Sequence, residues 1–168
     1  MEVIVRNFSR RIISFSVGFF LFSVFLLFSL TARATTITWT NTSTPNAASW
    51  TRSISNGKIT APGGNLYWLH TGTTSVTQTA GGGTPLNLLD DVYSVTGNHT
   101  VTNSEGKSRT ATVTEALEKK TICHNVTKGK LKIEGPNHFA IIDYGDGTCD
   151  NIVTISIDGR TPRTITLP

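Results

Sequence analysis

The chain has 168 residues, of which 15% are charged, and its formal net charge is +4. The first 34 residues contain Arg6, Arg10, Arg11, Arg33 and Glu2, so the rest of the chain has a net charge of only about +1. Nucleic-acid binding requires clustered positive charge, so we expect no nucleic-acid partner.

Residues 1–34 have the order of features of a secretory signal peptide. A cationic start is followed by an apolar run over residues 12–30 and then by Ala32-Arg33-Ala34, a small-x-small cleavage pattern. The apolar run is nearly long enough to span a bilayer, so an uncleaved N-terminal anchor is the alternative. Only in that case do we expect contact with a membrane. The sequence therefore predicts export to the periplasm, the cell surface or the extracellular space.

Residues 35–83 are rich in Thr, Gly and Ser and contain all three Trp residues. Apolar and polar residues alternate over 37–40, 65–69 and 74–79, which is typical of strands with one wet face. We expect this β region to be either a less regular lobe of one sheet or a partly flexible arm. Residues 86–91 are consistent with one turn of helix or with the entry to a strand.

Residues 84–168 contain further short alternating segments, separated by turns. The segments span 92–95, 100–102, 109–115, 130–134, 139–143, 152–157 and 163–167, and residues 103–106 have the composition of a hairpin loop. Residues 116–120 give the only other helical signal. Short strands without helical spacers indicate an all-β antiparallel fold, either a meander or sandwich or an elongated curled sheet, after an N-terminal signal helix. We expect residues 35–168 to form one structural unit.

Cys123 and Cys149 are the only two cysteines, and both follow the signal segment. Export to an oxidising compartment favours a disulfide between them. The alternative is a pair of thiols used in redox or metal chemistry. The chain has no Cys-x-x-Cys pattern, however, and two distant cysteines are poorly spaced for a metal.

The loop around Cys149 is rich in carboxylates and glycines. Asp146, Thr148 and Asp150 alternate as oxygen ligands do in calcium loops, and Asp143 can add a further ligand. The alternative is a tight turn, in which glycines take positive φ and Asp side chains cap backbone amides. We favour the turn and therefore expect no cofactor, with a calcium ion in this loop as the alternative.

From about residue 83 onward, three segments stand in a characteristic order: Thr84-Pro85-Leu86, Asp90-Asp91-Val92-Tyr93 and Asp143-Tyr144-Gly145-Asp146-Gly147-Thr148-Cys149-Asp150-Asn151. This order of motifs resembles a family of exported Bacteroidota β-proteins of unknown function. Many members look like lipoproteins, with a cysteine directly after the signal. This chain departs from that pattern, because Thr35 follows Ala34, and the departure favours a soluble exported form without a lipid anchor.

Trp50, Tyr67 and Trp68 belong to the one aromatic concentration of the chain outside the signal segment. On an exposed face these rings can stack on sugars, which would make the protein a carbohydrate-binding module. The alternative, which we favour, is that they fill the core.

The sequence identifies no catalytic residue. The four histidines, His70, His99, His124 and His138, are scattered, and no hydrolase or phosphate-binding motif occurs. We therefore expect a non-enzymatic exported protein that binds or structures something at the cell surface. A carbohydrate-binding module and a small periplasmic hydrolase are the alternatives. The sequence does not identify the partner, and a glycan or a cell-surface protein is the expectation.

Overall fold

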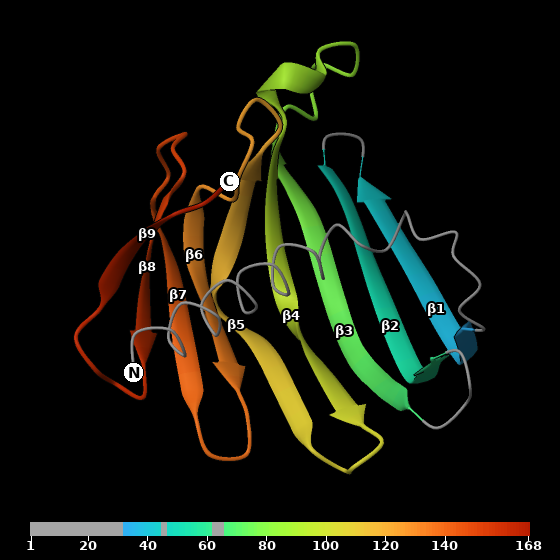
Figure 1. Ribbon diagram of the computed structural model, residues 1–168. Helices are drawn as coiled ribbons and strands as arrows, with labels where there is room; N and C mark the ends of the chain where they lie inside the picture. The colour runs from blue at the N-terminus through green and yellow to red at the C-terminus, as the bar shows by residue number, and fades with distance from the viewer. Residues whose placement is uncertain (1–31, 45–46, 62–65) are drawn as a thin grey trace. The chain divides into compact units, whose positions relative to one another are not determined.

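The computed structural model describes residues 32–44, 47–61 and 66–168. These residues form one nine-stranded antiparallel sheet, in which each strand pairs with the next one along the chain (Figure 1). The predicted all-β class and the predicted meander are therefore confirmed.

The strands are long at the N-terminal edge of the sheet and short at the C-terminal edge. Their bounds are β1 (Ala32–Thr44), β2 (Ala47–Thr60), β3 (Tyr67–Ala80), β4 (Val92–Asn103), β5 (Ser108–Lys120), β6 (Lys128–Glu134), β7 (Phe139–Asp146), β8 (Ile152–Ile157) and β9 (Arg163–Thr166). Within the described ranges the only helical element is the 3₁₀-helix η1 (Leu88–Asp90), so of the two alternatives for residues 86–91 the structure has the helical turn. The helical signal at residues 116–120 is wrong, because these residues lie in β5.

The predicted signal helix lies outside the described residues. The cleavage pattern itself is described, and Ala32, Arg33 and Ala34 form the first residues of β1, paired with β2. Among the residues whose placement is described, no helix is both long and apolar enough to cross a bilayer.

The strand register gives the sheet two chemically different faces, because directly opposed residues of antiparallel strands share a face. We call one the inner face; it carries Leu131 of β6 opposite Ile142 of β7, which in turn lies opposite Ile155 of β8. The same face continues through Ala111 of β5 to His99 of β4. The other side, which we call the outer face, carries mainly polar residues.

The apolar core lies at the C-terminal end of the sheet. Leu131 and Ile142 are 1% exposed and Val153 is 2% exposed. The described hydrophobic residues that are buried all lie at or after Leu117; they are Leu117, Cys123, Leu131, Ala140, Ile142, Tyr144, Val153, Ile155 and Leu167. Trp68 is 39% exposed and Trp50 is half-buried, so neither belongs to this core.

A glycine sets the local geometry where β5 and β6 change register. Gly129 has a φ of +104°, and a Cβ on it would lie 2.3 Å from the carbonyl oxygen of Ala116. Only glycine allows this backbone conformation with so close an approach. The register shift on this strand pair therefore depends on Gly129.

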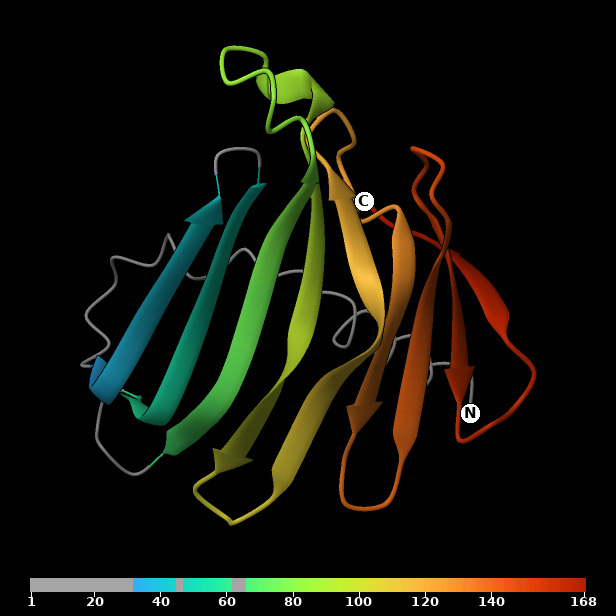
Figure 2. The same ribbon diagram turned by 180° about the vertical axis from the view of Figure 1, so that it is seen from behind.

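One loop extends past the ends of the strands. Residues 81–91, which include η1, project beyond β3 and β4 when the sheet is seen from either side (Figures 1 and 2). Its leucines are largely exposed: Leu86 is 101% exposed, and Leu88 and Leu89 are each 64% exposed. The loop is ordered from within by hydrogen bonds, among them one from the Thr84 hydroxyl to Asp90 Oδ2 of 2.6 Å.

Candidate functional site

Three adjacent strands place a polar cluster on the inner face, among aromatic and aliphatic side chains. His99 of β4 lies between two residues of β3: its Nδ1 is 2.9 Å from His70 Nε2, and its Nε2 is 2.5 Å from Thr74 Oγ1. Arg52 of β2 is directly opposite Thr74. We call these four residues the histidine cluster.

The cluster depends on a glycine for its space. Gly72 is opposite His99 in the register, and a Cβ on it would lie 2.3 Å from His99 Nδ1 and 2.4 Å from the carbonyl oxygen of Asn98. His99 is 5% exposed and Thr74 is 7% exposed. The imidazole of His99 therefore occupies the volume that a side chain at position 72 would take.

Burial keeps the imidazoles of the cluster neutral. Desolvation, with smaller contributions from the nearby His70 and Arg52 charges, lowers the pKa of His99 to about 4. Desolvation and Arg52 also lower the pKa of His70, and desolvation lowers the pKa of Arg52. At neutral pH the cluster thus contains one guanidinium ion beside two uncharged imidazoles.

Thr74, His99 and His70 have the order of a nucleophile, a base and an orienting group. Two features oppose catalysis. The hydroxyl and the central imidazole are buried, and an imidazole with a pKa of about 4 is a weak base at neutral pH. The arrangement satisfies the hydrogen bonds of polar groups within an apolar face, which buried polar groups require.

The buried carboxylate of this region belongs to a separate network. Asp91, which is 5% exposed, accepts hydrogen bonds of 2.7 Å from Gln78 Nε2 and 2.9 Å from the Tyr93 hydroxyl. The Tyr93 ring in turn meets the edge of Trp50, with the ring centroids 5.8 Å apart. This contact joins β2 and β4 across β3.

The structure does not bring Trp50, Tyr67 and Trp68 together. Tyr67 and Trp68 are neighbours on β3, so their side chains lie on opposite faces of the sheet. Trp50 is opposite Val76, near the other end of β3. On the outer face, Lys58 Nζ lies 4.4 Å from the centre of the Tyr67 ring.

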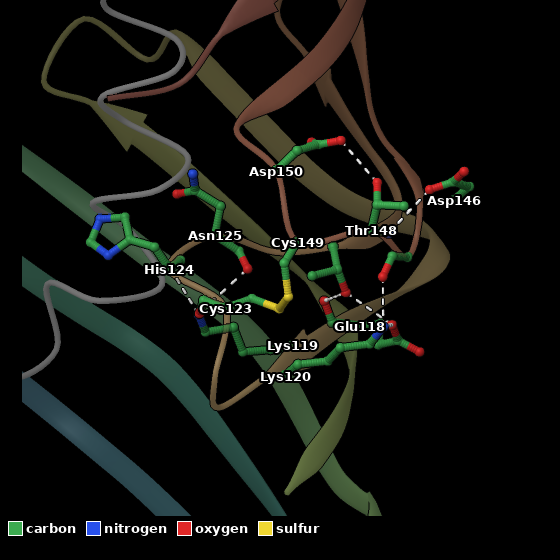
Figure 3. Close-up of a disulfide and its surroundings, with 12 residues drawn as sticks. Glu118, Lys119, Lys120, Cys123, His124, Asn125, Asp146, Thr148, Cys149 and Asp150 are labelled. Carbon is green, nitrogen blue, oxygen red and sulfur yellow. Dashed lines mark hydrogen bonds and ion pairs between the residues drawn. A yellow bond between two sulfur atoms is a disulfide. The ribbon is translucent and has the colours of Figure 1, made fainter. Parts of the chain in front are cut away.

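The predicted disulfide between Cys123 and Cys149 is confirmed, and it joins two loops 26 residues apart in sequence (Figure 3). Two lysines of β5 hold the same loops. Lys119 Nζ donates hydrogen bonds to the carbonyl oxygens of Cys123, His124 and Asn125, and Lys120 Nζ donates one of 2.6 Å to the carbonyl oxygen of Gly147. Desolvation lowers the pKa of Lys119. These ammonium groups thus cap the carbonyl oxygens of the stapled loops.

The four candidate calcium ligands make local turn contacts. The carboxylates of Asp143, Asp146 and Asp150 each accept a hydrogen bond from the backbone amide two residues later, and the Thr148 hydroxyl donates to Asp150. Gly145 and Gly147 both have positive φ, as the turn interpretation requires. In the described part of the chain, no three His, Cys, Asp or Glu residues are grouped so that they could hold a metal ion. Calcium binding stays a prediction.

The sequence did not indicate the histidine cluster, because its members are far apart along the chain. His70 and His99 are 29 residues apart, and they meet through the β3–β4 register, which places Gly72 opposite His99. The alternation of side-chain directions along each strand is enough to place both imidazoles on the inner face. Only the register shows that they touch.

Comparisons with known proteins give no match: no family model fits the chain, and neither the curated proteins nor the solved structures include a similar one.

Proposed function

We propose that the chain is an exported, non-enzymatic protein that binds a component of the cell surface through the faces of its sheet. The observation that carries this proposal is the construction of β2, β3 and β4. These are long strands of 14, 14 and 12 residues, yet no described hydrophobic side chain on them is buried. Strands that contribute so little to a core present surface instead, and an extended polar surface is suited to contact with another molecule.

Two features support export as part of this proposal. A disulfide between Cys123 and Cys149 is expected of a protein that folds in an oxidising compartment. The cationic and apolar start of the chain has the order of a secretory signal. We expect the mature chain to act in the periplasm or at the cell surface.

Co-sedimentation with envelope fractions tests the proposal. Purified, oxidised mature protein is mixed with isolated membranes, with peptidoglycan and with the polysaccharide of the producing cells. We expect saturable binding to at least one fraction, and loss of this binding when the protein is reduced and heat-unfolded first. A protein that sediments with none of the fractions would contradict the proposal.

A carbohydrate-binding module that uses Trp50 is the first alternative, because the half-buried Trp50–Tyr93 pair lies on the inner face. Stacking on this pair predicts that polysaccharide quenches or shifts tryptophan fluorescence, and that Trp50→Ala abolishes the change. Trp68→Ala, near the other end of β3 from Trp50, is the matched control and should keep the change. An unchanged emission spectrum at saturating polysaccharide excludes this site.

A periplasmic hydrolase is the second alternative, and the Thr74–His99–His70 chain is the observation that favours it. Nitrophenyl esters and nitrophenyl glycosides provide the test. We expect no turnover above that of free imidazole, because the hydroxyl is buried. Turnover that disappears in Thr74→Val and survives in Thr73→Val would replace the proposed function with this one.

A further inference from the structure

Serine and threonine side chains cover the outer face of the sheet from β1 to β5. We call this surface the hydroxyl face. The register places on it Thr38, Thr40, Ser49, Thr51, Ser53, Thr71, Thr73, Ser75, Thr77, Ser94, Thr96, Thr100, Thr102, Ser108, Thr110 and Thr112, with the amide of Asn98 among them. Each of these side chains is exposed or half-buried.

Hydrogen bonds between neighbouring strands hold many of these hydroxyls in place. Across β2 and β3, Thr51 and Ser75 are 2.9 Å apart, and the flanking pairs Ser49–Thr77 and Ser53–Thr73 are 3.1 and 3.2 Å apart. Across β4 and β5, Thr100–Thr110 and Thr102–Ser108 make the same contact at 2.9 and 2.8 Å. Because each hydroxyl has one proton but two lone pairs, the paired oxygens can still accept further hydrogen bonds.

No Lys, Arg, Asp or Glu is among these residues of the hydroxyl face, but charged residues border it on the same side of the sheet: Lys58 of β2 is opposite Leu69, and Glu118 of β5 is opposite Ser94. On β5, β6 and β7 the outer face carries ion pairs such as Lys130–Glu115 at 3.1 Å and Lys132–Glu134 at 2.7 Å. A protein surface normally mixes charges of both signs over its whole area. A wide neutral surface has a physical use when the face is covered by a partner, because covering a charge without a counter-charge costs far more than covering a hydroxyl group that keeps its hydrogen bonds.

The chemistry of the face identifies the class of partner. Acidic or basic polymers require opposite charges on the protein, which the hydroxyl face lacks. A protein partner usually relies on buried Trp, Tyr or Arg anchors, and none of these is among the residues of the hydroxyl face. A neutral polyhydroxylated chain needs fixed acceptors and donors at regular spacing. The sheet provides rows about 4.8 Å apart across the strands and about 6.8 Å apart along them.

We propose that the hydroxyl face binds a neutral polysaccharide. The proposal deepens the proposed function and rests on it, since it names the ligand class and the surface. The rigid χ1 of threonine and the cross-strand hydroxyl pairs fix the acceptors before binding, which reduces the entropy lost on association. Tyr67 and Leu69 lie on the same face at its margin, beside Lys58, whose Nζ is 4.4 Å from the centre of the Tyr67 ring. Leu69, which is opposite Thr102 and 39% exposed, adds an apolar surface for a sugar ring.

Depletion from solution by insoluble polysaccharides measures this binding. The probes are cellulose, a β-1,3-glucan, a mannan, a neutral xylan and starch, with polygalacturonate as the acidic comparison, and the protein is the oxidised mature chain. We expect saturable binding to at least one neutral polysaccharide. The affinity should change less than about twofold between about 0.05 and 0.5 M NaCl, because charges do not drive it.

A matched pair of lysine variants locates the binding surface. Thr96 of β4 and Thr164 of β9 are both exposed threonines on the outer face, but only Thr96 is in the hydroxyl face. We expect Thr96→Lys to weaken binding at least about tenfold, a change of about 1.4 kcal/mol, and Thr164→Lys to leave it unchanged. Thr100→Val combined with Thr110→Val removes both members of one hydroxyl pair and should also weaken binding, while the thermal melting point verifies folding.

The outcomes separate this inference from the proposed function. If the protein binds an envelope fraction but none of the neutral polysaccharides, or if Thr96→Lys binds as tightly as the wild type, the hydroxyl face is not the site. The proposed function then stands without it. Binding that Trp50→Ala abolishes while Thr96→Lys preserves it also overturns the inference. A protein that binds no envelope fraction at all contradicts both.

Discussion

His99 makes the stability of the fold depend on pH at the level of one residue. The unfolded chain takes up a proton on this imidazole near pH 6.5, whereas the folded protein does so only near pH 4. The unfolded state therefore binds more protons between these values, and the free energy of unfolding falls as the pH drops through this window. The loss is no more than about 3–4 kcal/mol and is absent above pH 6.5.

Urea unfolding between pH 4 and 7 measures this loss. We expect the unfolding free energy of the wild type to decrease towards acid and that of His99→Gln to depend less on pH. His124→Gln, which changes an exposed loop histidine, is the control and should retain the wild-type dependence. A His99→Gln profile as steep as that of the wild type would assign the acid sensitivity to other groups.

Gly72 is the second residue on which the histidine cluster depends. In Gly72→Ala the new methyl group would meet His99 Nδ1 and the carbonyl oxygen of Asn98 at less than 2.5 Å, so either β4 or the imidazole must move. We expect a loss of about 2 kcal/mol or more in unfolding free energy. Gly83→Ala, where the added Cβ has no atom within 4 Å, should cost far less in the same denaturation experiment.

At the scale of single elements, the disulfide is the contact whose removal is easiest to predict. The two cysteines are 26 residues apart in sequence, and the disulfide between them lowers the conformational entropy of the unfolded chain. In the chain-entropy treatment this raises the free energy of unfolding by about 3.5 kcal/mol. The lysine contacts to the same loops do not replace this constraint, because they form only in the folded state.

Paired serine substitutions test the disulfide. We expect Cys123→Ser combined with Cys149→Ser to lower the unfolding free energy by about 3–4 kcal/mol. Dithiothreitol should lower the unfolding free energy of the wild type but not that of the double variant. The measurement is guanidinium unfolding with and without reductant. Equal midpoints for the variant and the oxidised wild type would show that the remaining contacts of the two loops suffice.

The sequence predicted elements better than it predicted contacts between them. Alternation located the segments of β5, β7 and β8 within a few residues, and the hairpin loop expected at 103–106 is closed by a hydrogen bond from Gly106 N to the Asn103 carbonyl oxygen. The helical signal at 116–120 failed because Leu117 pairs with Val95 across the sheet, so tertiary burial overrides local propensity.

The aromatic candidates show why a site was harder to predict. Neighbours in sequence, such as Tyr67 and Trp68, separate to opposite faces as soon as the segment is a strand. Conversely, His70 and His99 meet only because the β3–β4 register places Gly72 opposite His99. Register depends on bulges and long-range pairing, which alternation alone does not reveal.

At the scale of the whole sheet, stability is expected to be uneven. Buried hydrophobic side chains and the disulfide lie in the C-terminal strands, whereas β2, β3 and β4 are held mainly by backbone pairing, hydroxyl pairs and the buried polar side chains Thr74, Asp91 and His99. Regions with few buried apolar contacts open with a lower free energy than the core. We therefore expect the sheet to open from the β1 edge towards β5.

Hydrogen exchange monitored by mass spectrometry can follow this opening strand by strand. Amides of β6, β7 and β8 should exchange most slowly, at rates set by global unfolding, and those of β2 should exchange at least about tenfold faster. Saturation with a ligand of the hydroxyl face should slow exchange in β2 to β4 and leave the β7–β8 rates unchanged, because the ligand covers only the former. Equal protection of all strands without ligand would show that the sheet unfolds as one cooperative unit and that its polar half is as stable as its core.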